Sequence, residues 1–544
     1  MVGADGSGEP PSLRPTGLSG VGWSDVCDVL QLSTGPVARA TVADLRVSGL
    51  TADSRLVHPG DLYVAAPGAT VHGADFTAEA IDRGAVAVLT DPAGVDRARA
   101  GSGSAPVAVV DRPRALIPAL ADRIYDHPSR RLRLFGITGT NGKTTTAYLL
   151  QAALRAAGLR VGLIGTIGFQ VDDRPLAARR TTVTTPEAAE LHALLAVMLE
   201  QGADAVVMEV SSHALALGRV DGLRFAVAAF TNFGSDHLDF HGDVGSYFAA
   251  KASLFTAERA DGAVISIDDA RGPELVDRSR REGLDPVRSV SLDGAADYTV
   301  RLREDAAGGR TTVTAGTPTA DVRFTLGLPG EFNVRNALTA LAMADLVGVD
   351  LERAAPGLAD AVVPGRMQRV DLGDGAPTVF VDFAHTPQAV SAVLAGLGGR
   401  RRIVVLGCGG DRDPEKRGPM GAAAAAAAEL VVVTDDNPRS EDPVAIRAQV
   451  LAGARAEAGR TDHAVQVVDG GPRRDAIAAA LAAAGPGDVV AVLGKGHERG
   501  QEVAGRVLPF ADEDAIREVW TALHPSAVAD RTATASDSSE RVHR

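Results

Sequence analysis

Short apolar runs and amphipathic segments alternate along most of this chain. Runs such as 132–137, 205–210 and 225–230 have the length of buried strands, and segments with apolar residues at helical spacing lie between them. This order predicts an α/β fold with a mostly parallel sheet and helices on its faces. Polar residues that follow successive strands would then gather at one edge of the sheet, where such folds bind ligands.

The spacing of these elements predicts three domains. A small α/β domain comes first, then a larger parallel-sheet domain in which 289–328 reads as a β insertion, then a Rossmann-like α/β domain. Both ends of the chain are polar and lack periodicity, which is typical of disordered tails. The predicted division is a tail at 1–22, domains at 23–130, 131–363 and 364–524, and a second tail at 525–544.

Composition excludes several classes of function. The formal net charge of -14 disfavours nucleic acid as a partner, because phosphate binding needs a basic face. The two cysteines, Cys27 and Cys408, are far apart, which argues against a disulfide framework. No run of 18 apolar residues and no signal-peptide core is present, so we expect a cytoplasmic protein that is not inserted in a membrane.

One loop indicates a nucleotide site. A buried strand at 132–137 leads into G-I-T-G-T-N-G-K-T-T, and a helical segment starts at Lys143. Gly139 and Gly142 would let backbone N–H groups surround an anion at the helix N-terminus. Lys143 supplies a charge for the β- and γ-phosphates, and the Thr144 hydroxyl is suited to Mg²⁺. The strict phosphate-loop pattern would need glycine at Ile137, so the match departs from the general form.

Two later strand ends carry candidate metal ligands. Glu209 ends a buried run, where a lone carboxylate is costly unless a cation neutralises it. A structural ion pair would serve as well as a metal ion, and we favour the metal. The next strand is followed by T-N-F-G-S-D-H-L-D-F-H-G, which packs Asp236, His237, Asp239 and His241 into six positions. This density favours a site over a solvated acidic loop.

The loop T-G-T-N-G-K-T-T, the segment M-E-V-S-S-H and the signature T-N-F-G-S-D-H-L-D-F-H-G together resemble the Mur ligase superfamily, the ATP-dependent amide-forming enzymes of peptidoglycan assembly. The resemblance runs from about residue 45 to 522. It implies ATP and Mg²⁺ as cofactors and ATP contacts at Gly139, Thr140, Asn141, Gly142, Lys143, Thr144, Thr145, Asn333, Arg366 and Asp382.

The resemblance also implies a catalytic set of Lys143, Glu209, His237 and Lys251. Mg²⁺ would be held by Thr144, Glu209, His237 and Lys251. Lys251 lies in S-Y-F-A-A-K-A-S and would otherwise be an ordinary surface lysine. In the family this lysine reacts with CO₂ to form a carbamate, which turns a cation into an anion.

The branch of the family that this chain resembles adds meso-diaminopimelate to UDP-N-acetylmuramoyl-L-alanyl-D-glutamate through an acyl phosphate. The UDP-sugar dipeptide would contact Ala52, Ser54, Ala69, Thr70, Val71, Thr184, Thr185, Ser211, Leu217 and Arg219. Thr185 and Pro186 also read as an N-cap and first helical residue, which would explain them without a ligand. Family members often have Gln in place of Leu217.

Diaminopimelate would bind to Arg412, Asp436, Asn437, Pro438, Arg439, Gly494 and Glu498. Arg439 belongs to D-N-P-R, the form found in diaminopimelate-adding members, and a guanidinium grips a distal carboxylate well. An Asx-Pro turn explains Asn437 and Pro438 but not the arginine.

Other functions remain open from the sequence. The same chemistry with L-lysine and a folylpolyglutamate synthetase are the nearest alternatives, and D-N-P-R together with the first domain argues against the latter. A phosphate-loop switch or transport ATPase is an alternative of another class. We expect a monomer.

Overall fold

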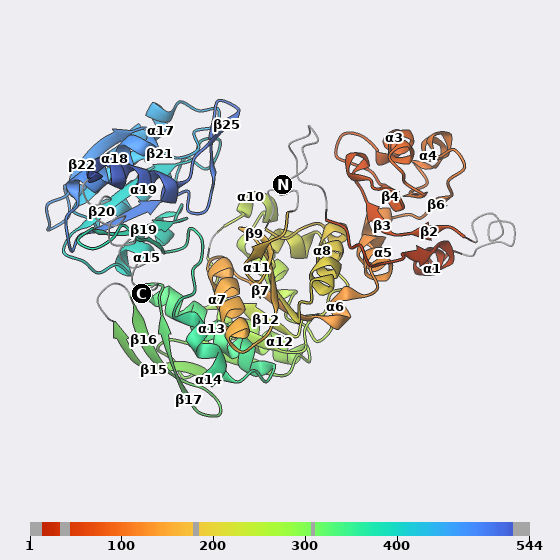
Figure 1. Ribbon diagram of the computed structural model, residues 1–544, viewed down its shortest axis with the longest axis horizontal. Coiled ribbons are helices and arrows are strands. Elements are labelled where there is room, and N and C mark those ends of the chain that lie inside the picture. Colours follow the sequence, from red (N-terminus) through yellow and green to blue (C-terminus); the bar gives the residue numbers. More distant parts are fainter. Residues whose placement is uncertain (1–12, 33–43, 178–183, 235, 306–309, 526–544) are drawn as a thin grey trace, which may run out of the picture. The chain divides into compact units, whose positions relative to one another are not determined.

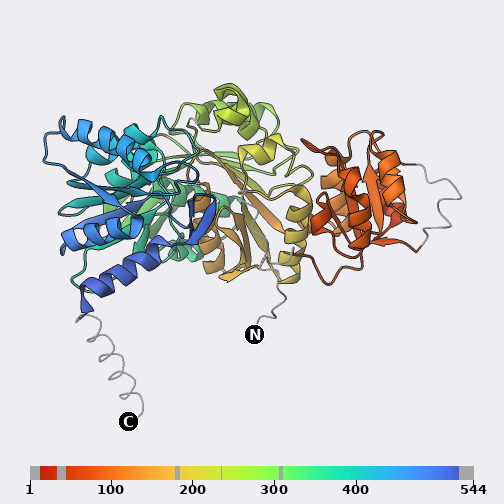
Figure 2. The ribbon, with the colours of Figure 1, turned by 90° about the horizontal axis from the view of Figure 1, so that it is seen from above.

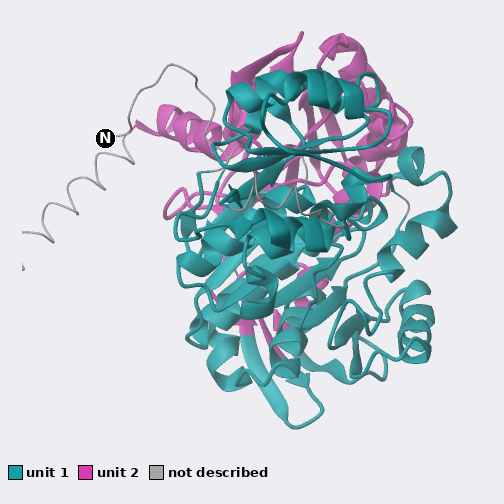
Figure 3. Ribbon diagram, turned by 90° about the vertical axis from the view of Figure 1, so that its right-hand side faces the viewer, with its two compact units in different colours: residues 1–302, 314–324, 335–358 teal, residues 303–313, 325–334, 359–544 magenta. Residues whose placement is uncertain are grey.

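The computed structural model describes residues 13–32, 44–177, 184–234, 236–305 and 310–525. They form two compact units (Figure 3). The first comprises residues 1–302, 314–324 and 335–358, and the second comprises residues 303–313, 325–334 and 359–544. No helix in the described ranges is both long and apolar enough to cross a membrane.

The N-terminal part of the first unit, red to orange in Figure 2, holds a four-stranded parallel sheet. Its strands, in spatial order, are β3 (Gly49–Thr51), β4 (Asp61–Ala65), β5 (Ala87–Thr90) and β6 (Val107–Val109). A short antiparallel pair precedes it, β1 (Val21–Gly22) with β2 (Arg46–Val47). Helical segments here are α1 (Trp23–Val29), η1 (Ser54–Leu56), η2 (Gly73–Phe76), α3 (Thr77–Asp82), α4 (Val95–Gly101), η3 (Pro113–Leu116) and α5 (Ile117–Ile124).

The central sheet has eleven strands in the order β10-β9-β8-β11-β7-β12-β13-β14-β15-β16-β17. Its bounds are β7 (Arg133–Thr138), β8 (Val161–Gly165), β9 (Gly168–Val171), β10 (Arg174–Pro175), β11 (Ala205–Glu209), β12 (Val227–Phe230), β13 (Ala263–Ser266), β14 (Val287–Ser291), β15 (Tyr298–Asp305), β16 (Thr311–Gly316) and β17 (Asp321–Leu326). The neighbouring strands β8, β11, β7, β12, β13 and β14 are all parallel, as predicted. The predicted β insertion forms β15 to β17, but it continues this sheet as its end and is not a separate sheet.

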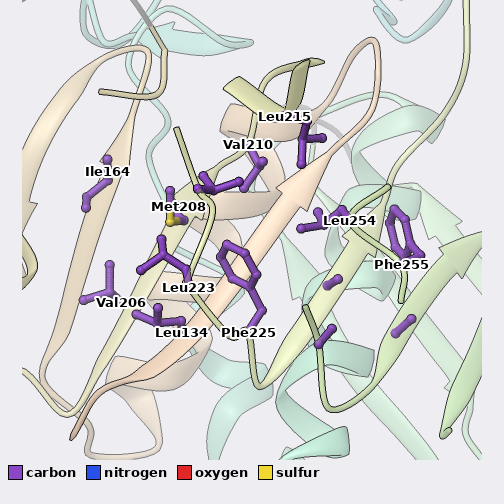
Figure 4. Close-up of a cluster of buried hydrophobic side chains, with 14 of the residues drawn as sticks. Leu134, Ile164, Val206, Met208, Val210, Leu215, Leu223, Phe225, Leu254 and Phe255 are labelled. Carbon is purple, nitrogen blue, oxygen red and sulfur yellow. The ribbon is translucent and has the colours of Figure 1, made fainter. Parts of the chain in front are cut away.

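Several helices are associated with the central sheet, and Figure 1 labels most of them. They are α6 (Pro128–Arg131), α7 (Lys143–Ala156), α8 (Ala188–Glu200), α9 (Ser212–Ala216), α10 (Leu238–His241), α11 (Val244–Ala252), α12 (Arg271–Arg281), α13 (Glu331–Leu346), α14 (Leu351–Ala354) and η4 (Ala355–Leu358). Strand β7 and the segment before β12 share one core, in which Leu134, Val206, Met208 and Phe225 pack together (Figure 4). Gly136 leaves room for this packing, because a methyl group there would lie 2.8 Å from the Phe225 ring.

The second unit contains a six-stranded sheet in the order β18-β19-β23-β20-β21-β22. The strands are β18 (Gln368–Val370), β19 (Thr378–Asp382), β20 (Arg402–Cys408), β21 (Leu430–Asp435), β22 (Gln466–Gly471) and β23 (Val489–Leu493). All pairs except β18 with β19 are parallel, as expected for a Rossmann-like sheet. Its helices are α15 (Pro387–Ala395), α16 (Arg417–Ala425), α17 (Pro443–Ala458), α18 (Arg473–Ala483) and α19 (Asp512–Leu523), and a hairpin joins β24 (Gly500–Val503) to β25 (Arg506–Pro509).

Part of the predicted N-terminal tail is bound to the fold, so that prediction is wrong from residue 13 onward. Arg14 donates to Asp61 at 2.9 Å, and the backbone N–H groups of Thr16 and Gly17 donate to the Glu200 carboxylate. The buried Asp61 carboxylate needs a counter-charge, which Arg14 supplies. The polar composition of the segment around Arg14 gave no indication of this contact.

Helix α8 connects the two parts of the first unit. Leu191 and Leu195 join the core of the central sheet, whereas Ala193 and Ala196 join the core of the N-terminal sheet. His192 lies between them with no exposed surface, and neither ring nitrogen has a hydrogen-bond partner among the described residues. Burial lowers the pKa of His192 to about 4.

We therefore predict acid sensitivity centred on His192. Because its folded-state pKa lies below the unfolded value, the neutral ring contributes stability that is fully present above pH 6.5 and is lost as pH falls towards 4. At pH 5 this one group should cost about 2 kcal/mol of unfolding free energy. Denaturant unfolding at pH 7.5 and pH 5 should show a flatter pH dependence in His192→Leu than in the unmutated protein, with His524→Leu as control. Parallel losses in both proteins would contradict the prediction.

Candidate active site

The register of the central sheet brings three predicted site loops together. Strand β7 lies between β11 and β12, with Ile137 beside Glu209 and Thr138 beside Phe230. The loop that follows β7 is therefore flanked by the loops that follow the other two strands. Strand order, and not separation in sequence, gathers the candidate chemistry at one sheet edge.

The loop between β7 and α7 has the conformation that its glycines predict. Gly139 has φ of +144° and Gly142 has φ of +85°, which strain most side-chain-bearing residues. Neighbouring side chains hold the loop. The Thr231 hydroxyl donates to the Asn141 carbonyl at 2.6 Å, and the Asn232 side chain both accepts from Asn141 N–H and donates to its carbonyl. Helix α7 begins directly after it, so its N-terminus opens towards the loop.

Glu209 ends β11 with 1% of its surface exposed. Its carboxylate accepts hydrogen bonds from the Thr144 hydroxyl at 2.9 Å, from Thr166 N–H at 2.9 Å and from the Thr166 hydroxyl at 3.1 Å. Hydroxyl donors thus satisfy it in place of the alternative structural ion pair. A hydroxyl and a carboxylate in contact are oxygen ligands of the kind that Mg²⁺ prefers, so these two residues fit that metal.

Two lysines converge on one backbone carbonyl in this loop. Lys143 donates to Gly139 and Thr140 carbonyls at 3.0 Å, and Lys251 of α11 donates to the same Gly139 carbonyl at 2.8 Å. Lys251 is not a surface lysine, since 1% of it is exposed and its ammonium lies over the Tyr247 ring. Burial, and then the positive charge of Lys143, hold the pKa of Lys251 well below its usual value. Burial beside a second lysine thus disfavours the charged form of Lys251.

The loop after β12 places His237 beside an aromatic cluster. Its ring lies 4.9 Å from the His213 ring and 6.2 Å from the Tyr247 ring, centroid to centroid. Burial lowers the pKa of His237, which favours the neutral, metal-binding form. Across the described ranges no three His, Cys, Asp or Glu side chains are grouped to hold a metal, so a metal here would depend on other ligands as well.

Four of the residues expected at the UDP-sugar dipeptide lie together beside β11. The Thr185 hydroxyl donates to the Glu209 carbonyl and lies 3.4 Å from the Ser211 hydroxyl. Arg219 donates to the Thr185 carbonyl, and the Thr166 hydroxyl donates to that of Thr184. Thr185 is not an N-cap, because α8 begins three residues later at Ala188 with Glu187 before it. Leu217 is 55% exposed.

The predicted UDP residues of the N-terminal part occupy two segments around β4. Ser54 is buried and donates to Glu79 at 3.2 Å, whereas Ala69, Thr70 and Val71 are exposed in one turn. Ala52 is half-buried against the core of this sheet. The exposed turn is available to a ligand, and the Ser54 hydroxyl already has a partner.

Asn336 lies against the phosphate loop, since a methyl group on Gly142 would lie 2.6 Å from its Oδ1. Asn333, the predicted residue, donates to the Pro329 carbonyl within the second unit. In that unit both Asp382 oxygens accept backbone N–H groups, from Met367 and Ala384, and burial raises the pKa of Asp382. The Arg366 guanidinium lies over the Phe383 ring.

The D-N-P-R segment of the second unit lies close to the other residues predicted for diaminopimelate, and we refer to this group as the proposed amino-acid pocket. A methyl group on Gly494 would lie 2.5 Å from Asp436 Oδ2, and one on Gly409 would lie 3.0 Å from Arg439 Nη1 and 4.0 Å from Arg412 Cγ. Asn437 donates to Glu498 at 2.8 Å. The structure thus brings these polar ends together.

The Arg439 guanidinium is partly exposed and already has hydrogen-bond partners. Its side chain is 24% exposed, Nε lies 3.2 Å from Glu502, and Nη1 donates to the Gly410 carbonyl at 2.6 Å. Its φ of +52° is unusual for a residue with a side chain. Its N–H donates to the Glu502 carbonyl in β24, and its carbonyl accepts from the N–H of Ala504, which follows that strand. The β24–β25 hairpin therefore fixes the position of Arg439, and Glu502 in that hairpin is its counter-ion.

Sequence reasoning missed the residues that support this chemistry. Thr166, Thr231 and Asn232 hold the phosphate loop and Glu209, and Lys495 and Glu502 hold the second-unit pocket. The T-N of the T-N-F-G-S-D-H signature was a usable signal for two of them. Lys495 lies between the predicted residues Gly494 and Glu498, whereas Thr166 and Glu502 belong to no predicted motif.

A glycine-bearing phosphate loop at the edge of a parallel sheet, with a buried threonine and glutamate in contact beside it, defines an ATP-dependent enzyme of the phosphate-loop class. The chain belongs to the Mur ligase family. Three family models match it: the Mur ligase middle domain at residues 137–344, the glutamate ligase domain at 365–496, and the Mur ligase family catalytic domain at 46–125.

Individual relatives are similar over nearly the whole chain. UDP-N-acetylmuramoyl-L-alanyl-D-glutamate–2,6-diaminopimelate ligase of Streptomyces avermitilis is 49% identical, covering 87% of this chain and 92% of the relative. UDP-N-acetylmuramyl-tripeptide synthetase of Leifsonia xyli is 42% identical, covering 88% and 92%. A solved UDP-N-acetylmuramoyl-L-alanyl-D-glutamate–2,6-diaminopimelate ligase is 29% identical with a TM-score of 0.67, covering 93% of this chain and 99% of that one.

The conformation of Gly139 provides a test of the phosphate loop. Gly139→Ala should abolish detectable ATP binding, because its methyl group would lie 2.0 Å from Thr231 Oγ1 at a φ that L-residues avoid. Gly398→Ala is the control, since nothing lies within 4 Å of its methyl group. Calorimetric titration with ATP should show binding in the control only, and an alanine variant at residue 139 with unchanged affinity would disprove this account of the loop.

Proposed function

We propose that this enzyme joins meso-diaminopimelate to UDP-N-acetylmuramoyl-L-alanyl-D-glutamate at the expense of ATP. One observation carries the choice of amino acid: Arg439 shares a pocket with Asn437 and Glu498. The pocket thus offers both a guanidinium and a carboxylate, which match an amino acid with a carboxylate and an ammonium at its distal end. The names of the Streptomyces relative and of the solved ligase support the same substrates.

In the proposed reaction a side-chain carboxylate oxygen of the D-glutamate residue attacks the γ-phosphorus of ATP, and ADP leaves. The amine of diaminopimelate then attacks the acyl carbon, phosphate leaves with the bonding electrons of the C–O bond, and the nitrogen loses a proton. Lys143 and the N-terminus of α7 would stabilise the negative charge of the phosphates. Mg²⁺, which the family uses, would supply further charge neutralisation, with Thr144, Glu209 and His237 as its proposed ligands.

We propose that Lys251 acts as its carbamate. The neutral amine would attack the carbon of CO₂ and release one proton, and the product would be an anion beside Lys143. Two observations support this: both lysines contact the Gly139 carbonyl, and Lys251 is almost fully buried. An anion there would attract both Lys143 and Mg²⁺, whereas an ammonium would repel them.

Lys251→Ala should lower the turnover number by about two orders of magnitude or more, because it removes an anionic partner of the metal. Added acetate or formate should restore part of the activity by occupying the space that the side chain leaves. Phosphate release in CO₂-depleted buffer is the measurement. An alanine variant that turns over at a near-normal rate would exclude the carbamate role.

Selectivity for diaminopimelate is tested by Arg439→Ala. Because Glu502 already pairs with Arg439, lysine does not strand a buried charge, so we expect discrimination of about 10²- to 10³-fold in kcat/KM, which is weaker than for a fully desolvated site. The variant should lose most activity on diaminopimelate and little of its residual activity on lysine. Equal rates of the unmutated enzyme with both amino acids would overturn the choice of substrate.

Phosphate release from the purified enzyme with the UDP-linked dipeptide and each candidate amino acid separates the remaining alternatives. A switch or transport ATPase would release phosphate without an amino acid, and a folylpolyglutamate synthetase would require a folate. Since ATP and a nucleotide-linked precursor are the proposed substrates, we propose the cytoplasm as the site of the reaction. The monomeric state stays a prediction.

A further inference from the structure

We infer that Lys495 is a positioning residue of the amino-acid pocket, whose buried ammonium aligns Asn437 and Glu498 towards the incoming amino acid. This inference rests on the proposed function of that pocket. Lys495 follows β23 and stands one residue after Gly494, so the end of a central strand of the six-stranded sheet carries it.

The surroundings of Lys495 match an ammonium group. The side chain has no exposed surface, and Nζ lies 3.3 Å from Asn437 Oδ1, 3.1 Å from Glu498 Oε2 and 2.5 Å from the Gly500 carbonyl. An ammonium has three donors on one nitrogen, and here three acceptors surround it. A guanidinium spreads its donors over a plane and would not place three of them at this point.

The composition of the chain points the same way. Lysine and arginine total 55, but only four of these residues are lysines: Lys143, Lys251, Lys416 and Lys495. Arginine is therefore the ordinary cation of this protein. Two of the other lysines lie in the phosphate-loop site, where a compact charge is needed. The lysine at 495 indicates a comparable chemical requirement.

Lys495 determines which atoms of the pocket remain for a ligand. Glu498 Oε2 accepts from both Lys495 and the Asn437 amide, whereas no described residue donates a hydrogen bond to Oε1. The Asn437 carbonyl oxygen accepts from Lys495 and from Glu502 N–H, which fixes the amide orientation. Oε1 of Glu498 is thereby left as the acceptor for the ammonium of the incoming amino acid.

A purely structural role is the rival explanation, because Lys495 also ties β24 to the end of β23. The two roles differ in what they change. Loss of a structural tie would lower stability and affect all substrates alike. Loss of alignment would raise the KM for the amino acid and leave the KM for ATP almost unchanged.

The test uses Lys495→Met, which keeps much of the side-chain length and removes the charge, with Lys416→Met as the matched lysine control. We expect the KM for diaminopimelate to rise about tenfold to a hundredfold, the range for losing a hydrogen bond to a charged group. The KM values for ATP and for the UDP-linked dipeptide should change by about twofold or less. Equal increases for all three substrates would overturn the inference.

A double-variant cycle identifies the route of the effect. If Lys495 acts through Glu498, the variant that combines Lys495→Met with Glu498→Gln should have nearly the KM of Glu498→Gln alone. Fully additive effects would contradict this. Should Lys495→Met fail to fold, Lys495→Gln replaces it in the assay, because it keeps an N–H donor while removing the charge, and an unchanged KM in that variant would also refute the inference.

Different results would refute the proposed function and the role of Lys495. If the proposed function is wrong, diaminopimelate does not stimulate phosphate release by the unmutated enzyme. If only the role of Lys495 is wrong, the unmutated enzyme is active with diaminopimelate and Lys495→Met keeps its KM for that substrate.

Discussion

The active site of the first unit depends on one backbone oxygen, the carbonyl of Gly139, which accepts hydrogen bonds from both Lys143 and Lys251. The two nitrogens therefore lie no more than about 6 Å apart. Two positive charges at that separation repel by roughly 3 kcal/mol at an effective dielectric constant of 20. This repulsion adds to the cost of burying Lys251, so the arrangement favours a neutral amine at that residue or an added anion. Lys143, at the N-terminus of α7, is the proposed phosphate partner.

Much of this site was predictable because local patterns and the sheet rule agree. Buried runs that end in Glu209 or in T-N-F-G-S-D-H predicted parallel strands, and parallel strands must place their ends at one edge. The phosphate loop was recognisable from its glycines, and their positive φ values confirm its conformation. The prediction did not need the complete strand order, because any order in which β7, β11 and β12 are neighbours produces the same juxtaposition.

Other features could not be predicted, because they depend on residues distant in sequence. Thr166 follows β8 and lies 43 residues before Glu209 in the sequence, and its hydroxyl and N–H reach Glu209 only because β8 and β11 are neighbours in the sheet. The segment around Arg14 has the polar composition of a tail, and only the position of Asp61 explains its attachment. The capping interpretation of Thr185 was wrong for a similar reason. Its hydroxyl donates to the carbonyl of Glu209, a residue distant in sequence, and does not cap α8.

In the proposed amino-acid pocket of the second unit, the counter-ion Glu502 lowers the selectivity that Arg439 can provide. A buried guanidinium with no other partner would discriminate against lysine by the full free-energy cost of leaving a buried charge unpaired. Arg439 instead pairs with Glu502, so a ligand carboxylate has to displace Glu502 or share Arg439 with it. The selectivity for diaminopimelate over lysine then depends on the difference in free energy between the Arg439–ligand pair and the Arg439–Glu502 pair. The hairpin that supplies Glu502 also supplies the Gly500 carbonyl to Lys495. One short β-hairpin therefore contacts both Arg439, the proposed partner of the distal carboxylate, and Lys495, which supports Glu498, the proposed partner of the ammonium.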